Sequence, residues 1–251
     1  MKYLKKIYTL IKKGDFITLF RKTVQFIAAK IWFYISVKKD KKIGSRKLTD
    51  TIPTKYEKLG AYDTQSTDYA CLNKIFHDKP LADDDVFVDV GCGEGRVLTY
   101  LYLKGFKGKI IGVELDPDIA KTAADRTSDC QNIEVKCSNI LECTDVLKTA
   151  SVYYLFNPFC GKILLQLVEK IEENATQPVK IYYCNDLYKR VLVGRSDWSI
   201  IREGKIKRLH ATTMSYSVHL FSPPQKWLYS KTTNNNKKSI KIFKKVLEKY
   251  R

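Results

Sequence analysis

Residues 86–96 read Val86-Phe87-Val88-Asp89-Val90-Gly91-Cys92-Gly93-Glu94-Gly95-Arg96, and this stretch decides the fold. Apolar residues on both faces up to Asp89 are typical of a buried parallel strand. The glycines that follow let the backbone turn sharply and approach a ligand without interference from a Cβ atom. Apolar residues at helical spacing come next, at Val97, Leu98, Leu101 and Leu103. A strand, a glycine-rich turn and a helix in this order predict a ligand-binding loop.

A second strand and helix follow the loop. The second strand is predicted over residues 109–114 and ends in Glu114, 19 residues after Gly95. In folds of this kind, a carboxylate at the end of the second strand binds a ribose diol. A helix is predicted over residues 118–126, with Asp116 as its N-cap.

The glycine spacing argues against a dinucleotide. The pattern is Gly-x-Gly-x-Gly, and Asp89 stands just before it. An acid at this turn would repel a pyrophosphate but would suit an ammonium group. The loop from Asp89 to Gly95, together with Glu114, resembles the class I S-adenosylmethionine (SAM) methyltransferases over residues 81–222.

This resemblance implies a set of cofactor-binding residues. The loop would lie against the methionine part of SAM, with Asp89 orienting the loop or binding the amino group, and Glu114 would bind the ribose hydroxyls. Asn139 stands where the family often has an Asp that binds the adenine amino group; its carbonyl can accept the same bond, or it is an ordinary turn residue. The implied cofactor-binding residues are Asp89, Gly91, Cys92, Gly93, Gly95, Glu114, Asn139, Thr67 and Tyr69.

The acceptor is expected at the end of the fourth strand, which is predicted over residues 152–156 and ends in Asn157-Pro158-Phe159. Ligands of open α/β sheets bind beyond the carboxyl ends of the strands. The tripeptide resembles the Asn-Pro-Pro-Tyr/Phe signature of amino-group methyltransferases, but it has only one Pro. The resemblance implies that the Asn157 side chain and the following carbonyl accept hydrogen bonds from a target amine. The alternative is a turn that ends the strand.

Upstream of the loop, residues 62–69 precede a helix predicted over 70–76. Residues 87–98 and 155–159 look more specifically like a group of poorly characterised bacterial methyltransferases that often occur with surface-polysaccharide genes and share a basic N-terminal helix. That group has a Thr-x-Tyr element at the position of residues 67–69. A more distant likeness is to the lysine methyltransferases of the disruptor-of-silencing type. The likeness implies pocket roles for Thr67 and Tyr69, whereas polar residues here can also be helix caps. The catalytic candidates are Asn157, Pro158, Phe159 and Asp68, and Asp186 is a further candidate base for a hydroxyl acceptor.

The rest of the body fits the same α/β fold, a Rossmann-like class I methyltransferase sheet with helices on both faces. A helix is predicted over residues 161–174, a fifth strand over 179–184 and a closing hairpin from 198–203 and 212–221. The seven Cys and three His residues show no metal-ligand spacing, so we expect no metal site. An odd number of Cys without a secretory signal indicates a reduced, cytoplasmic chain.

The net charge of +18 gathers at the two ends. Residues 1–58 hold a net +12 and residues 230–251 a net +7, whereas the middle is close to neutral. Basic ends predict an anionic partner, although Lys enrichment can also reflect an A+T-rich genome.

Residues 2–13 and 16–37 both show apolar residues at helical spacing with basic residues between them. The unbroken apolar stretches are far shorter than the roughly 20 residues of a membrane span. The pattern predicts basic amphipathic helices lying at an anionic membrane surface, or else packing on the body. The C-terminal residues 239–251 show a similar pattern.

These observations predict three parts, namely a basic helical arm (1–58), a SAM-dependent methyltransferase domain (59–228) and a linker with a basic helix (229–251). The expected function is methyl transfer from SAM to a glycan, lipid-linked or other small acceptor near the membrane, at its inner face. The alternatives are a protein-lysine or nucleic-acid methyltransferase and a SAM-binding protein without catalysis. The sequence leaves the oligomeric state open.

Overall fold

The structure is a computed structural model that describes residues 12, 15–42, 48, 51–77, 81–193, 195, 197–206 and 209–216. The chain divides into two compact units, residues 1–49 and residues 50–251. Residues 50–58, which the sequence analysis placed in the basic arm, therefore belong to the second unit. Nearly all of the predicted helix 2–13 and the whole predicted C-terminal part, 229–251, lie outside the described residues.

The first unit contains one long helix, α2 (Phe16–Asp40). The helix begins at Asp15, whose carboxylate accepts a hydrogen bond from the backbone N–H of Thr18 at 3.0 Å. Lys38 and Lys39 lie in its last turn, where positive charge complements the helix dipole. The helix runs three residues beyond the predicted end. No helix in the described part of the chain is both long and apolar enough to cross a membrane.

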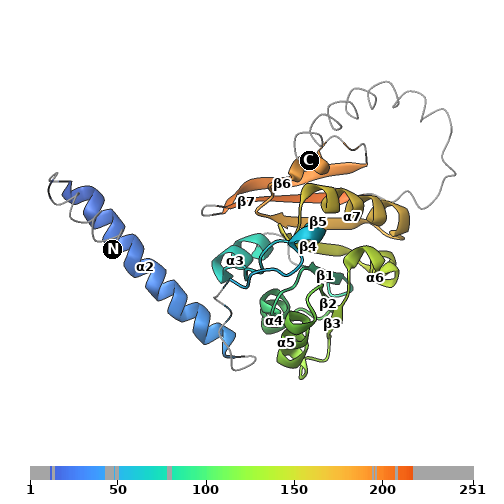
Figure 1. The fold of residues 1–251 in the computed structure, drawn as a ribbon, viewed down its shortest axis with the longest axis horizontal. Helices are drawn as coiled ribbons and strands as arrows, with labels where there is room; N and C mark the ends of the chain where they lie inside the picture. Colours follow the sequence, from blue (N-terminus) through green and yellow to red (C-terminus); the bar gives the residue numbers. More distant parts are fainter. Residues whose placement is uncertain are drawn as a thin grey trace. The chain divides into compact units, whose positions relative to one another are not determined.

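The second unit is built on one seven-stranded sheet with the strand order β3-β2-β1-β4-β5-β7-β6 (Figure 1). The first five strands are parallel, and β6 and β7 close the sheet as an antiparallel hairpin. The strands predicted over residues 109–114, 152–156 and 179–184 have the predicted bounds, and the hairpin strands differ by a few residues. The strands are β1 (Val86–Val90), β2 (Lys109–Glu114), β3 (Ile133–Cys137), β4 (Val152–Phe156), β5 (Val179–Cys184), β6 (Trp198–Ile206) and β7 (Leu209–Tyr216).

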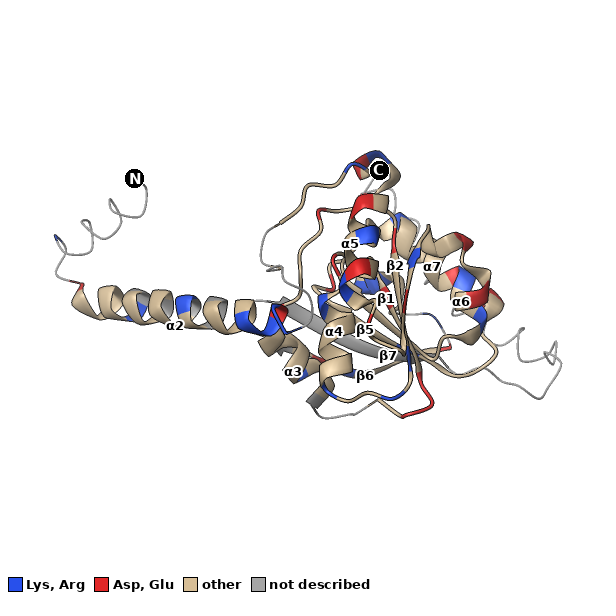
Figure 2. Cartoon of the chain, turned by 90° about the horizontal axis from the view of Figure 1, so that it is seen from below, with Lys and Arg blue, Asp and Glu red and all other residues tan. Residues whose placement is uncertain are grey.

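Helices cover both faces of this sheet (Figure 2). Neighbouring residues of β1 face opposite sides of the sheet, so each side has its own core. Val88 belongs to a core with α6 and α7, and Phe87 belongs to a second core with α3 and α4. The predicted α/β fold is confirmed. The helices are α3 (Tyr69–His77), α4 (Arg96–Leu103), α5 (Pro117–Thr127), α6 (Thr144–Thr149) and α7 (Gly161–Asn174), with short 3-10 helices η1 (Glu57–Leu59), η2 (Ile140–Glu142) and η3 (Lys189–Val191).

The strand order reverses between β1 and β4. β1 pairs with β2 on one side and with β4 on the other, and the chain leaves β1 and β4 toward opposite halves of the sheet. The crevice at the carboxyl ends of such a strand pair is where open α/β sheets bind ligands.

Residues 51–64, here called the strap, form a loop that the sequence analysis did not predict. An antiparallel bridge between Ile52 and Thr64 closes it, with backbone hydrogen bonds of 3.0 and 2.9 Å. The strap is bound to the turn after β4, because the carbonyl of Gly60 accepts from the N–H of Cys160 at 2.8 Å. The strap thereby becomes a wall of the crevice.

Candidate active site

A cavity of about 330 Å³ lies at the reversal point of the sheet. Its walls come from the strap, the glycine loop after β1 and the ends of β2, β3 and β4. Of the residues implied by the sequence, those that line it are Asp89, Gly91, Cys92, Gly93, Glu114, Asn139, Thr67, Pro158 and Phe159.

The glycine loop is packed too closely for side chains. Gly91 and Gly93 have positive φ angles of 72° and 55°. A Cβ atom on Gly91 would lie 2.8 Å from Cβ of Pro158, and one on Gly93 would lie 2.7 Å from Cγ2 of Thr64. Glycine is therefore required where the loop meets the turn after β4 and the strap.

Glu114 holds the glycine loop from the end of β2. Its carboxylate accepts hydrogen bonds from three backbone N–H groups, those of Gly93 at 2.9 Å, Leu115 at 2.9 Å and Asp116 at 3.1 Å. Burial raises the pKa of Glu114, and the three hydrogen bonds oppose that rise. The carboxylate is thus fixed in one orientation at the cavity wall.

Asp89 brings a second carboxylate to the cavity. It is 2% exposed, and its Oδ2 atom is buried without a hydrogen-bond partner in the described residues. Burial, and then the charge of Glu114, raises the pKa of Asp89 well above its ordinary value. A buried acceptor oxygen without a partner destabilises a protein unless a ligand donates to it. The ammonium group of SAM would supply that donor, so the residues present fit this cofactor.

The polar groups of the turn after β4 form hydrogen bonds with other parts of the protein. Asn157 has a positive φ of 46°, and its Oδ1 accepts a hydrogen bond from the hydroxyl of Tyr183 at 2.9 Å. The carbonyl of Pro158 accepts from the N–H of Tyr62 at 3.0 Å. Pro158 and Phe159 line the cavity, whereas Asn157 does not. Both oxygen atoms implied for an acceptor amine therefore already have a partner.

Among the upstream candidates, Thr67 lines the cavity, and its hydroxyl lies 2.9 Å from that of Tyr154. Asp68 accepts from the N–H of Ala70 at 2.7 Å and so caps α3. Tyr69 is buried in the core below α4. Asn139 caps η2 through a 3.1 Å bond to the N–H of Leu141. Five implied residues lie outside the cavity wall, namely Asn157, Asp68, Tyr69, Gly95 and the further candidate Asp186.

Sequence reasoning left Arg96 unassigned although it directly follows the loop. Arg96 is 5% exposed, and its Nη1 donates to the carbonyl of Thr67 at 3.3 Å. Its guanidinium lies 5.2 Å from the centre of the Tyr69 ring. Among the described residues it is the only Lys or Arg that lines the cavity. The position of Arg96 directly after Gly95 is the sequence feature that could have indicated its place in the cavity wall.

Comparison with known families adds the deciding observation. Residues 87–171 match a family model described as a methyltransferase domain. The chain carries a SAM-dependent methyltransferase domain. The match begins in β1 and ends in α7, so it contains the glycine loop, Glu114 and the turn after β4. The predicted methyltransferase and its predicted methyl donor are confirmed.

Solved structures resemble this methyltransferase domain at low identity. An RNA methyltransferase from Salinibacter ruber, solved with S-adenosylhomocysteine, is 16% identical, with a TM-score of 0.49; the match covers 64% of this chain and 97% of that one. A SAM-dependent methyltransferase from Aquifex aeolicus is also 16% identical, with a TM-score of 0.47, and 57% and 87% of the two chains are covered. These distant likenesses say nothing about the acceptor of this chain. The comparison with curated proteins finds no significant match.

Proposed function

We propose that this methyltransferase transfers the methyl group of SAM to a small acceptor, such as a glycan or a lipid-linked sugar, at an anionic membrane surface. The observation that carries the choice of acceptor is the charge of the cavity wall. Four acids line it, namely Asp63, Asp89, Glu114 and Asp116, against the single cation Arg96 in the described residues. A polyphosphate backbone needs the opposite balance of charge.

The size of the cavity supports the same choice. About 330 Å³ is near the lower end of the range for small-molecule sites, and the bound donor takes part of it. The strap forms one wall, so the acceptor group shares the enclosed space with the donor. A small molecule, or one sugar of a longer lipid-linked chain, meets this requirement.

At the donor end, two of these acids have defined roles. The free oxygen of Asp89 would accept from the ammonium group of SAM, and Glu114 would accept from the ribose hydroxyls while it keeps its backbone hydrogen bonds. Asn139, at the end of β3, would lie beside the adenine. When bound, SAM supplies a methyl group on a positively charged sulfur, which is already reactive.

At the acceptor end, the protein mainly supplies alignment and excludes water. Pro158 and Phe159 form an apolar wall, and Tyr62 of the strap, whose N–H is bonded to the carbonyl of Pro158, lies beside them in the same cavity lining. Asn157 acts as a positioning residue, because its bond to Tyr183 fixes the turn that carries Pro158. The hydroxyl of Tyr62 is hydrogen-bonded to that of Tyr188, and burial and this bond raise the pKa of Tyr62, so the ring is held in place in the cavity wall.

The membrane part of the proposal is supported by the surface of α2. Apolar side chains at helical spacing are exposed along it, including Phe20 at 69% and Ile31 at 54%. Basic residues accompany them, among them Arg21, Lys30 and Lys38. A helix with an exposed apolar stripe and Lys or Arg beside it suits the interface of an anionic bilayer. The full stripe in the described residues is Phe16, Ile17, Phe20, Val24, Ile27, Ile31 and Tyr34.

A product search tests this function. SAM labelled in its methyl group would be offered with lipid and glycan, protein, and RNA fractions in separate reactions, and the products identified by mass spectrometry. We expect label in the lipid and glycan fraction only. Label in RNA or protein would replace the proposed acceptor class, and no label despite SAM binding would favour a binding protein without catalysis.

A further inference from the structure

The strap is attached to the domain in two different ways. Toward the turn after β4 it is held by two backbone hydrogen bonds. The N–H of Tyr62 donates to the carbonyl of Pro158, and the N–H of Cys160 donates to the carbonyl of Gly60. Ala61 and Phe159 also form an antiparallel bridge there. Toward the start of α5 the described contact is ionic, and it comes from Lys55.

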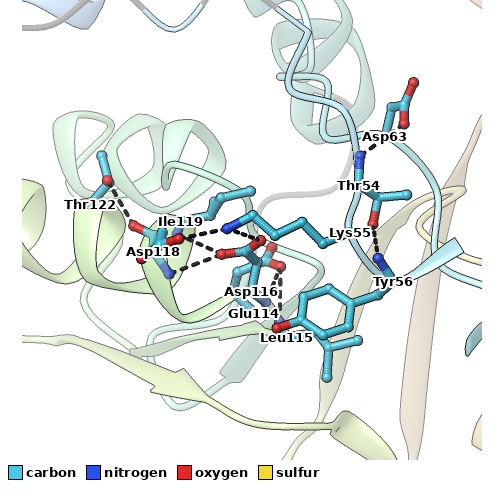
Figure 3. A network of polar contacts seen from close by, with 10 residues as sticks. All are labelled: Thr54, Lys55, Tyr56, Asp63, Glu114, Leu115, Asp116, Asp118, Ile119 and Thr122. Atoms are coloured by element: carbon cyan, nitrogen blue, oxygen red, sulfur yellow. Dashed lines mark hydrogen bonds and ion pairs between the residues drawn. The ribbon is translucent and has the colours of Figure 1, made fainter.

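Lys55 reaches across from the strap to two acids (Figure 3). Its Nζ atom lies 2.6 Å from Oδ2 of Asp118 and 3.6 Å from Oδ2 of Asp116. The side chains of Lys55 and Asp118 are 65% and 80% exposed. Exposed ion pairs are weak and screened by salt, so this edge opens more easily than the backbone-bonded edge.

Tyr56, the next residue, faces the end of β2. Its ring extends from the strap toward Glu114 and Leu115 (Figure 3). All three residues line the cavity. The N–H of Tyr56 is bonded to the hydroxyl of Thr54 at 3.1 Å, and the carbonyl of Tyr56 accepts from Leu59 at 2.9 Å, so the ring is carried by an ordered turn.

We propose that the strap is a cover for the donor site, with Tyr56 as its contact to the ribose and adenine end of SAM and the Lys55 ion pairs as its latch. The cover opens at the latch edge, while the backbone bonds to the turn after β4 act as the hinge. Gly60, with a φ of 86°, lies at that hinge. This inference rests on the proposed function, and it adds a binding segment that lies outside the matched residues 87–171.

The latch is tested by the kinetics of S-adenosylhomocysteine binding to the full chain, measured by surface plasmon resonance. Lys55→Met keeps most of the side-chain stem and removes the charge. Lys58→Met is the matched control, because Lys58 lies on the same strap and has no ion-pair partner among the described residues. We expect Lys55→Met to raise both the association and the dissociation rate by about 3- to 10-fold, since the open state becomes more populated. The control should keep the wild-type rates.

Two further measurements distinguish a strap that opens at the Lys55 ion pairs from a strap that is a fixed wall. Raising the salt concentration from about 0.05 M to 0.5 M should bring the wild-type rates toward those of Lys55→Met and leave that variant nearly unchanged. Tyr56→Ala should raise the dissociation rate by about 10-fold with little change in association, whereas Tyr56→Phe should stay close to wild type.

Equal rates for Lys55→Met and Lys58→Met would overturn the latch, and wild-type dissociation from Tyr56→Ala would overturn the contact. Both residues are at least partly exposed, so circular dichroism should show folded variants. If the wild-type chain binds neither SAM nor S-adenosylhomocysteine, the proposed function itself fails. The two failures are therefore distinguishable.

Discussion

The carboxylate of Glu114 accepts the backbone N–H of Gly93 at 2.9 Å, so the end of the second strand fixes the loop that follows the first. The same carboxylate is the group expected to bind the ribose. Donor binding and loop geometry are therefore coupled through one side chain, and substitutions at Glu114 should affect both.

Glu114→Gln should weaken SAM binding by about 2–4 kcal/mol, the scale of lost charge-assisted hydrogen bonds to the ribose. The amide keeps the shape and one acceptor oxygen, so the fold should survive. Calorimetry gives the affinity, and a thermal melt gives the stability. Glu134→Gln, on the exposed face of the neighbouring strand, is the control. Unchanged affinity in Glu114→Gln would remove Glu114 from the site.

SAM affinity should rise with pH because of Asp89. Burial raises the pKa of Asp89 in the folded protein, so this group adds stability below its ordinary value of 3.8, and that contribution is lost as the pH rises through the raised pKa. An ammonium group binds the ionised form, so binding releases a proton in this window.

The check is calorimetry between about pH 5 and 7, where the amino group of SAM stays charged. Asp89→Asn should bind more weakly, show a flatter profile and release no proton. Its unfolding stability without SAM should rise relative to wild type at the upper end of the range. A wild-type profile as flat as that of Asp89→Asn would contradict the assignment.

Asn157→Gly and Tyr183→Phe should have similar effects, because each removes the same buried hydrogen bond. Glycine tolerates the φ of 46° at residue 157, and Tyr183→Phe also removes the 3.3 Å bond from the N–H of Tyr188. We expect a loss of about 1–3 kcal/mol in stability. Turnover should fall by roughly 10- to 100-fold with SAM affinity nearly intact, because the turn that carries Pro158 loses its fixed geometry.

Single-turnover rates and SAM affinities measured on both variants provide the check. A fall in turnover for Asn157→Gly alone would mean that the Asn157 side chain touches the acceptor. Normal turnover per folded molecule in both variants would leave only a structural role for the bond.

Binding to acidic vesicles should depend on the apolar stripe of α2. Phe20→Glu and Ile31→Glu place a charge among exposed apolar residues and should each weaken binding by about 10-fold or more. Thr18→Glu introduces the same charge on the other face of the helix and should have a much smaller effect. Vesicle sedimentation at two salt concentrations measures this, and equal binding to neutral and acidic vesicles would contradict the electrostatic part.

The second, fourth and fifth strands could be predicted to the residue because each is a short, largely apolar run that ends at or just before a polar residue, namely Glu114, Asn157 and Asn185. The glycine loop, Glu114 and Pro158 could be placed for the same reason, since the carboxyl ends of parallel strands share one edge. The spacing of apolar and polar residues along the chain therefore predicts these strands and the residues at their carboxyl ends, and the folded structure agrees with that prediction.

Local sequence pattern does not predict the hydrogen bond of Asn157 or the shape of the strap. The partner of Asn157 is Tyr183, 26 residues away, and nothing in the tripeptide indicates that bond. The strap has no helical or alternating pattern, and its shape comes from bridges between Ile52 and Thr64 and between Ala61 and Phe159. The role of Asp68 could not be decided from the sequence for a different reason, because a helix N-cap and a general base both use a carboxylate.

The way the strap is held has a consequence for how this enzyme can diversify. The bonds at its hinge join backbone N–H and carbonyl groups; every residue provides the carbonyl, and only proline lacks the N–H. The side chains of Leu59 and Tyr62, which line the cavity, can therefore be exchanged without loss of those bonds. The sheet and the donor loop would stay unchanged. Acceptor preference can thus evolve, or be redesigned, as a separate module at the cost of a few surface substitutions.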